Sequence, residues 1–350
     1  MGASVTIDLV SPHPAQGPAA QGPDHAEDVL TSLTRLLNAD IESCNRTIVD
    51  RMDSPVALIP QLAAHIVAAG GKRLRPLLTL ACARLCGYRG DRHIKLAACV
   101  EFIHTATLLH DDVVDESQLR RGLASANAVF GNKASVLVGD FLFARSFQLM
   151  VEDGSLKVLE ILSRAAATIA EGEVLQLVTQ NDLTTDEARY LDVIKGKTAA
   201  LFEAGCQVGA VVADRPEVES ALAAYGMSLG IAFQLVDDAL DYAADQATLG
   251  KTVGDDFREG KITLPVLIAL AAANEEERAF WTRTVEQLEQ TESDLDHAVM
   301  LMGRCNAIEL TLDRARSFAR QAKDALAVFP PSELRDCLCG IADYTVARAR

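Results

Sequence analysis

The chain has 350 residues, of which 49% are hydrophobic and 5% aromatic, and it carries a formal net charge of −16. This length and apolar fraction can supply a sizeable core, and the abundance of Ala and Leu favours closely packed helices. The negative charge argues against general nucleic-acid binding, which requires a basic footprint. The sequence contains no uninterrupted apolar segment of about 18 residues, which predicts that no segment spans a membrane. It also shows no pattern typical of a secretory signal.

The eight cysteines are expected to be free thiols. None forms a Cys-x-x-Cys pair, and no spacing of Cys and His fits a zinc site. Most of them stand among Ala, Leu and Val, as buried free thiols do. This pattern predicts a reducing, cytoplasmic setting for the protein.

The N-terminal segment differs in composition from the rest of the chain. Residues 1–27 are rich in Pro, Gly, Ala and Gln, which predicts a disordered tail, with a docking arm as its functional alternative. From Asp28 onward leucines recur at helical spacing, and no further break in composition occurs. We therefore expect one large domain over residues 28–350, although length alone suggests about two domains.

Helical patterns then follow one another along the chain. Two glycines end a helix over 54–69, and Pro76 suits the first turn of the next one. Three cations stand between them, Lys72, Arg73 and Arg75, at a helix N-terminus that adds partial positive charge. This junction is a candidate anion pocket, with a basic solvated turn as the alternative. Further helices are predicted over 76–86, 92–116, 134–151, 156–180, 186–213, 217–242, 261–273, 275–290, 293–303, 305–328 and 331–348.

Two apolar helices end in aspartate-rich motifs of the same design, Asp-Asp-x-x-Asp. The carboxylates are Asp111, Asp112 and Asp115 in the first motif and Asp237, Asp238 and Asp241 in the second. Residues four apart share one face of a helix, so each motif crowds carboxylates that repel one another and are costly to bury alone. One such motif could be a solvated helix face. Two copies favour a deep acidic site for Mg²⁺, which shares its coordination shell with waters and substrate phosphates.

Cations occur close to both motifs in the sequence. They are Arg120, Arg121, Lys197, Lys251 and Lys261. Such side chains could simply pair with the aspartates, or they could clamp a diphosphate that metal ions hold from the other side. Since Lys197 lies in the middle of a helix among Ala and Leu, where an unpaired lysine is unusual, it is a candidate for the second role.

Metal ions and cations together suit the departure of a diphosphate leaving group. The sequence offers no nucleophile–base triad and no cofactor fingerprint. The helix that leads into Asp111 is apolar, so a polar head group would be held over an apolar tunnel. This combination suits an isoprenoid diphosphate.

From about residue 30 to its end, the chain resembles the trans-polyprenyl diphosphate synthases. The resemblance rests on Gly71-Lys-Arg-Leu-Arg-Pro76, His104 to Asp115, Arg120-Arg121-Gly122, Gly139-Asp-Phe-Leu142, Lys197-Thr198, Phe233 to Asp241, and Gly250-Lys-Thr to Lys261. It implies an all-α fold, a single-domain isoprenoid-synthase helical bundle around a central cavity, usually as a homodimer. It also implies a Mg²⁺-dependent, head-to-tail prenyltransferase, in which isopentenyl diphosphate attacks an allylic cation and the departed diphosphate accepts the proton.

The resemblance implies roles for single residues as well. About three Mg²⁺ ions would be held with the diphosphate, by Asp111, Asp115 and Asp237. The catalytic set would be completed by Asp112, Asp238 and Lys197. The allylic diphosphate would be contacted by Arg120, Lys197 and Lys261. The diphosphate of isopentenyl diphosphate would be bound by Lys72, Arg75, His104 and Arg121. The remaining lining would come from Thr198, Gln234 and Lys251.

Product length depends on the helix before the first aspartate, because the growing tail should descend along it by about 1.5 Å per residue. In short-chain members of the family, bulky aromatics four or five residues before that aspartate close the tunnel. Here the positions are Ala106 and Thr107, and Ile103 lies further down. We expect a floor from Phe147 or Met150 on a neighbouring helix.

This open tunnel predicts a product of about C40–C50 at that rise per residue. Decaprenyl diphosphate is the preferred product, made from farnesyl or geranylgeranyl diphosphate for the side chain of ubiquinone. So apolar a product is expected to leave by peripheral contact with a membrane. The alternatives are a geranylgeranyl diphosphate synthase and a non-catalytic regulatory subunit of a prenyl synthase.

Overall fold

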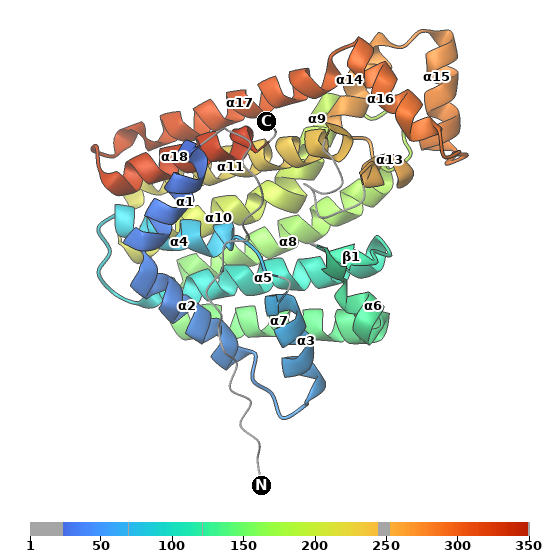
Figure 1. Cartoon of the computed structure of the whole chain (residues 1–350). Helices are drawn as coiled ribbons and strands as arrows, with labels where there is room; N and C mark the ends of the chain where they lie inside the picture. The colour runs from blue at the N-terminus through green and yellow to red at the C-terminus, as the bar shows by residue number, and fades with distance from the viewer. Residues whose placement is uncertain (1–23, 69, 121, 244–252, 349–350) are drawn as a thin grey trace.

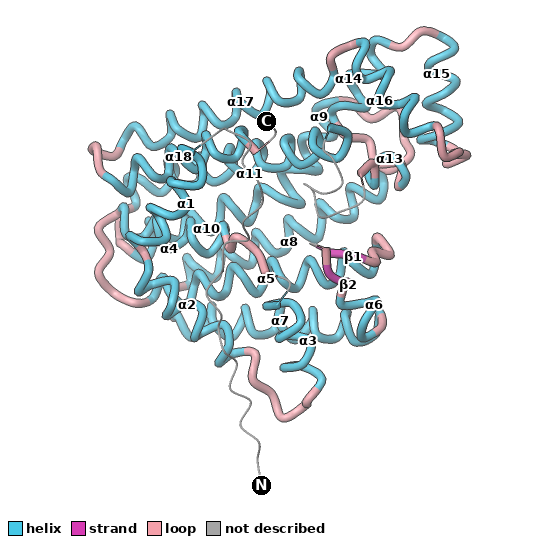
Figure 2. The backbone as a smooth tube through the Cα atoms, viewed as in Figure 1, coloured by secondary structure: helices cyan, strands magenta, loops and turns pink. Residues whose placement is uncertain are grey.

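The computed structural model describes residues 24–68, 70–120, 122–243 and 253–348. These residues are almost entirely helical, with one two-stranded antiparallel hairpin, β1 (Leu119–Arg120) and β2 (Leu123–Ala124). Figure 2 shows helices throughout the bundle, with the hairpin at one edge. The expected all-α fold is therefore confirmed. Residues 1–23 of the predicted tail lie outside the described residues, and residues 24–27 begin the first helix.

Most predicted helices occur within a few residues of their expected bounds. The structure contains α1 (Asp24–Leu36), α2 (Asn38–Arg51), α3 (Leu58–Ala68), α4 (Leu74–Leu85), α5 (Arg92–Val114), α6 (Ala126–Phe130), α7 (Asn132–Asp153), α8 (Leu156–Thr179), α9 (Glu187–Ile194), the π-helix η1 (Lys195–Ala199), α10 (Ala200–Val212), α11 (Pro216–Ala243), α13 (Asp255–Arg258), α14 (Leu264–Ala272), α15 (Glu275–Trp281), the π-helix η2 (Thr282–Glu286), α16 (Asp294–Arg304), α17 (Ala307–Ala325), the 3₁₀-helix η3 (Leu326–Val328) and α18 (Glu333–Ala347).

The centre of the bundle is built from α4, α5, α10 and α11 (Figure 1). Every residue of α4 from Pro76 to Ala83 is buried, as expected of a helix that is apolar almost all round. The helix α10 can pass close to α4 because Gly209 has no side chain. A Cβ at this position would lie only 2.7 Å from Cys82 Cβ. Small residues thus let the central helices pack closely against one another, which restricts movement at their ends.

A smaller apolar core lies at the end of the bundle where α13 to α16 pack together (Figure 1). Trp281 is fully buried there, and its ring meets Phe257 and Phe280 edge to face. The long helices α11 and α17 pack along each other over the main bundle. The next described helix after α11 is α13, and its Phe257 belongs to this smaller core.

The helix α7 is long and apolar enough to cross a membrane by length and composition, a result that the sequence pattern did not predict. Only 39% of its most apolar window is buried, although one face packs along α5. Of the two residues expected to close the tunnel, Phe147 is 40% exposed in the single chain and Met150 is buried, and their role as a floor stays a prediction. The exposed apolar residues continue onto α8, which gives the two helices a shared apolar outer face.

The cysteines are free thiols, as predicted, and most of them are buried. Burial raises the pKa of the Cys44 thiol to about 12 and that of Cys86 to about 11. Cys99 donates a hydrogen bond from its thiol to the carbonyl of Ser146. These groups remain protonated and act as packing residues.

Candidate active site

The first aspartate motif lies on the last turn of α5. Asp112 is buried and accepts hydrogen bonds from Arg120, at 2.8 Å from Nε and 2.6 Å from Nη2 to Oδ1. The turn at 115–118, between α5 and β1, brings Arg120 back to the helix that precedes it. Arg120 therefore lies at the motif as predicted, but its guanidinium forms an ion pair with the Asp112 carboxylate. Arg121 lies outside the described residues.

The other two carboxylates of this motif lie in a crowded and largely desolvated place. Burial raises the pKa of Asp111, the negative charges of Asp115 and Asp112 raise it further, and Lys197 and Arg120 oppose the shift. Burial and the neighbouring carboxylates together therefore outweigh the two cations in their effect on the pKa of Asp111. A divalent cation would remove this repulsion.

The second motif lies near the end of α11, where its three aspartates meet different partners. Asp238 is buried and accepts hydrogen bonds from the Tyr190 hydroxyl at 2.5 Å and from Gln234 Nε2 at 2.8 Å. Burial raises the pKa of Asp238 to about 7, with further contributions from Asp256 and Asp237, against these hydrogen bonds. Both carboxylate oxygens of Asp238 thus accept hydrogen bonds from side chains of the protein.

The third aspartate of this motif also serves the local fold, whereas the first is more exposed. Asp241 accepts a hydrogen bond from the backbone N–H of Asp256 at 3.0 Å, which anchors the start of α13. The Asp237 side chain is 40% exposed, and Nη2 of Arg348 lies 3.1 Å from its Oδ1. Asp237 is therefore the second-motif carboxylate most accessible to an ion or a substrate.

Lys261 links the first motif to α13. Its Nζ lies 3.8 Å from Asp115, at the end of α5, and 3.7 Å from Asp256, in α13, and it also pairs with Glu259. Burial lowers the pKa of Lys261, but Asp256, Asp115 and Glu259 outweigh that effect and raise it overall. The sequence prediction that this lysine approaches the aspartates agrees with the geometry. Lys251 lies outside the described residues.

Lys197 and Thr198 lie in the π-helix η1, where the sequence pattern predicted an uninterrupted helix over 186–213. The wider turn directs both side chains to partners on neighbouring helices. Lys197 Nζ donates to Glu173 Oε2 at 2.6 Å, and Thr198 Oγ1 donates to Gln234 Oε1 at 2.8 Å. Single π turns inside α-helices are frequent at functional sites.

The π turn lies directly against α8 through two glycines. A Cβ on Gly172 would overlap the backbone nitrogen of Lys197, and a Cβ on Gly196 would lie 3.1 Å from Gly172 Cα. The absence of side chains at these positions lets the two backbones touch. This contact brings Glu173, the next residue of α8, beside Lys197.

Glu173 is a candidate site residue that the sequence reasoning missed. Burial raises its pKa to about 7, Lys197 lowers it, and the charges of Asp111 and Asp115 raise it. Its electrostatic environment thus includes the first aspartate motif. The available signal was Gly172 in the interior of α8, since a glycine there costs helix stability and marks a close backbone approach.

The predicted anion pocket lies at the start of α4. Arg75 Nη1 donates to His104 Nε2 at 3.1 Å, and the Arg75 guanidinium lies 4.4 Å from the centre of the Phe202 ring. Lys72 bonds to the Tyr344 hydroxyl on α18. The structure thus brings Arg75 and His104 together, as the resemblance implied, and ties Lys72 to the C-terminal helix.

The residues assigned to chain length lie on α5, one to two turns before the first motif. Ala106 and Ile103 are completely buried. Thr107 is partly buried and donates its hydroxyl proton to the His104 carbonyl at 2.8 Å. The role of these three residues in setting chain length stays a prediction.

The donor set fits a metal ion that shares its ligands with a substrate. Among the described residues, no three His, Cys, Asp or Glu side chains converge into a preformed metal cage. Mg²⁺ is typically held by one or two carboxylates together with waters and substrate phosphates, so it needs no such cage. The desolvated carboxylate of Asp111, with Asp115 on the same helix face, supplies hard oxygen donors of this kind.

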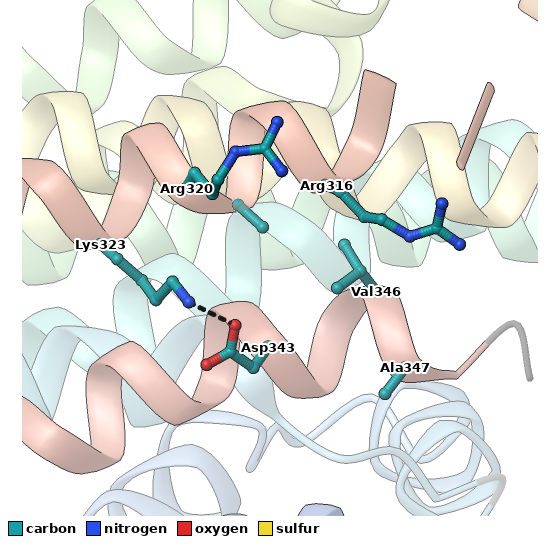
Figure 3. A pocket seen from close by; sticks show the side chains of 7 residues that line it. Arg316, Arg320, Lys323, Asp343, Val346 and Ala347 are labelled. Carbon is teal, nitrogen blue, oxygen red and sulfur yellow. Dashed lines mark hydrogen bonds and ion pairs between the residues drawn. The ribbon is translucent and has the colours of Figure 1, made fainter. Parts of the chain in front are cut away.

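A separate groove of about 430 Å³ lies between α17 and α18, and Figure 3 shows the side chains that line it. Two of its cations are paired with acids of the same two helices. Lys323 Nζ lies 2.6 Å from Asp343, and Arg316 Nη1 lies 2.7 Å from Glu309. The aspartate motifs do not line this groove, so we assign the chemistry to the end of α5 and α11.

Comparison with known proteins decides the family. The polyprenyl synthetase family matches residues 56–302 of the chain. The chain belongs to the polyprenyl synthetase family. It is 48% identical over 322 residues to the octaprenyl diphosphate synthase of Escherichia coli, which covers 92% of this chain and 99% of that protein.

Two solved structures are similar over nearly the same length. A polyprenyl synthase from Caulobacter crescentus, complexed with calcium and isoprenyl diphosphate, is 55% identical with a TM-score of 0.89, covering 92% of this chain and 98% of that one. A decaprenyl diphosphate synthase from Rhodobacter capsulatus is 54% identical with a TM-score of 0.88, covering 92% and 99%. The expectation of a long-chain trans-prenyltransferase with the isoprenoid-synthase fold is thereby confirmed.

Proposed function

We propose that this prenyltransferase condenses isopentenyl diphosphate with farnesyl or geranylgeranyl diphosphate at the end of α5 and α11. The observation that carries the proposal is the position of Lys261, less than 4 Å from carboxylates of two different elements, Asp115 and Asp256. Carboxylates and cations alternate there at short range, which suits a diphosphate bound together with divalent metal.

The proposed metal ligands are Asp111, Asp115 and Asp237, with about three Mg²⁺ ions in the loaded site. When bound, Mg²⁺ neutralises charge on the departing diphosphate and lowers the barrier to its loss. The side chains proposed to bind the allylic diphosphate are Arg120, Lys197 and Lys261. Those proposed for isopentenyl diphosphate and the remaining lining are Lys72, Arg75, His104, Arg121, Thr198, Gln234 and Lys251.

The catalytic work of the protein is to bind the two diphosphates, exclude water and hold the reacting carbons together. Asp112 holds Arg120, Asp238 holds Gln234, and Glu173 holds Lys197. These pairs keep the cations and the amide in fixed orientations while the allylic diphosphate leaves. The departing diphosphate accepts the proton that the condensation product loses.

The proposed product is an all-trans chain of about C40–C50, with decaprenyl diphosphate preferred. This length follows if the growing tail descends along α5 by about 1.5 Å per residue. The absence of a bulky aromatic residue at Ala106 and Ile103 is the argument for a tunnel that continues past them. The relatives support the same range, since one is an octaprenyl and another a decaprenyl diphosphate synthase. Such products are used as quinone side chains, so we place the enzyme in ubiquinone biosynthesis.

A product assay tests this function. Purified protein receives Mg²⁺, farnesyl diphosphate and labelled isopentenyl diphosphate, and the dephosphorylated products are sized by reverse-phase chromatography. A single long-chain peak is expected. A geranylgeraniol peak would instead identify the alternative short-product synthase, and binding without incorporation would identify a regulatory subunit.

We also propose that the enzyme is a cytoplasmic homodimer that buries the apolar outer face of α7 and α8. The face comprises Leu137, Phe147, Val151, Leu156, Val174, Leu177 and Val178, all exposed in the single chain. Exposed apolar surface of this extent is typical of an interaction site. Light scattering after size exclusion should give twice the chain mass. Leu137→Asp should lower that mass, whereas detergent-dependent association would favour a membrane contact at this face.

A further inference from the structure

The last turn of α18 closes over the second aspartate motif. Arg348 Nη2 lies 3.1 Å from Asp237 Oδ1, and the Arg348 side chain is 20% exposed. Its guanidinium also lies 4.3 Å from the centre of the Phe233 ring, one turn before Asp237 on α11. The arginine is therefore held by a ring and a carboxylate at once, which distinguishes it from a solvated surface side chain.

The aromatic ring under Arg348 belongs to a continuous wall between the two ends of the site. The rings of Phe233 and Phe202 are 5.6 Å apart, and the Arg75 guanidinium lies over the Phe202 ring. Tyr344, one turn before Arg348, bonds to Lys72. The end of α18 thus contacts both the cation pocket on α4 and the carboxylate on α11.

The Arg348 guanidinium therefore places a positive charge beside Asp237, a carboxylate that we propose as a metal ligand. The guanidinium at 3.1 Å from Oδ1 reduces the negative potential that the Asp237 carboxylate offers to a cation. A metal ion that binds Asp237 must therefore either displace Arg348 or bind beside its positive charge, and both weaken metal binding.

We propose that Arg348 is a positioning residue that acts as the counter-ion of Asp237 in the metal-free enzyme. It competes with the metal for this carboxylate, so the ion binds Asp237 weakly until a diphosphate supplies further oxygen ligands. Metal loading of the α11 wall is in this way coupled to substrate binding. The inference rests on the proposed role of Asp237 as a metal ligand.

The test measures metal binding in the absence of any diphosphate. Free Mn²⁺ is titrated by electron paramagnetic resonance against the full-length protein and its Arg348→Met variant. Since the pair is partly exposed, removing the competing charge should tighten Mn²⁺ binding about two- to fivefold. The matched control is Arg35→Met, which removes an equal charge from an exposed pair with Glu333 at the opposite end of α18.

A double-mutant cycle separates this inference from the function it rests on. Asp237→Asn should weaken Mn²⁺ binding, and adding Arg348→Met to Asp237→Asn should then produce no further change. Equal Mn²⁺ affinities in Arg348→Met and Arg35→Met, with Asp237→Asn weakened, would overturn the counter-ion role alone. Unchanged affinity in Asp237→Asn would overturn the metal role of Asp237, and the counter-ion role with it.

Discussion

The ammonium of Lys197 donates a hydrogen bond of 2.6 Å to the carboxylate of Glu173, and both side chains are mostly buried. The pair crosses from the π-helix η1 to α8, and it lies within the electrostatic reach of Asp111 and Asp115. A lysine on a flexible stem has many rotamers, and this partner selects one of them. Glu173 therefore sets the direction in which Lys197 presents its charge.

Removing the carboxylate should impair catalysis more than folding. We expect Glu173→Ala to lower kcat/KM about 10- to 100-fold, in the range found for residues that orient a functional group. Glu173→Gln retains a hydrogen-bond acceptor and should lose less. Steady-state kinetics should show the loss in kcat, with the KM for isopentenyl diphosphate little changed. Glu171→Ala, on an exposed position of the same helix, is the control; an equal loss there would contradict the role of Glu173.

The stability of the metal-free protein should decline as the pH rises from about 4.5 to about 7. The pKa of Glu173 rises from 4.5 to about 7 on folding, so the native state binds more protons than the unfolded state in this interval. The free energy of unfolding therefore falls with increasing pH. Urea unfolding in the presence of a chelator should show a shallower pH dependence for Glu173→Gln than for the wild type. Identical slopes for the two proteins would contradict the raised pKa.

Filling the stretch of α5 before the aspartates should shorten the product. Ala106 is completely buried, and a phenylalanine there would project a ring into the space assigned to the growing chain. We expect Ala106→Phe to give products of about C15–C20 and to cost about 1–3 kcal/mol of stability through overpacking. Reverse-phase chromatography measures the first effect and thermal unfolding the second. Ile103→Leu conserves volume and should leave product length unchanged; an unaltered product from Ala106→Phe would show that the tail runs elsewhere.

A methyl group between α8 and the π turn should damage both stability and activity. In Gly172→Ala the new Cβ would overlap the backbone of Lys197, so η1 must move away from α8. We expect a loss of about 1–3 kcal/mol in the free energy of unfolding and a lower kcat. Gly303→Ala is a matched helical control, because nothing lies within 4 Å of its added Cβ. That variant should be stabilised by about 0.5–1 kcal/mol, and equal effects in the two variants would contradict the contact.

Much of the helix order and of the site could be predicted because the signals are local. Periodic apolar residues define the helices, and Asp111 and Asp237 stand in motifs whose spacing crowds carboxylates onto one face. The hairpin at Leu119–Ala124 was not predicted, since strands of two residues carry no periodicity. Arg120 lies on its first strand and contacts Asp112, eight positions earlier in the chain.

The residues that the sequence reasoning missed are fixed by contacts between distant segments. Glu173 and Lys197 are 24 positions apart, and Arg348 meets Asp237 across 111 positions. Neither Glu173 nor Arg348 belongs to a motif. Their importance follows from a glycine contact and from the path of α18, and both depend on tertiary packing that no local pattern encodes.

The π turn has a further consequence for how this chain can vary. It accommodates one residue more than an α-helical turn, so deleting one residue there would let α9 and α10 join as a regular α-helix with the faces of α10 in their present register. The deletion would, however, shift Lys197 and Thr198 away from Glu173 and Gln234. We therefore expect a one-residue deletion in this turn to leave a cooperative unfolding transition in calorimetry and to lower kcat, so that the extra residue serves the site and not the packing of the helices.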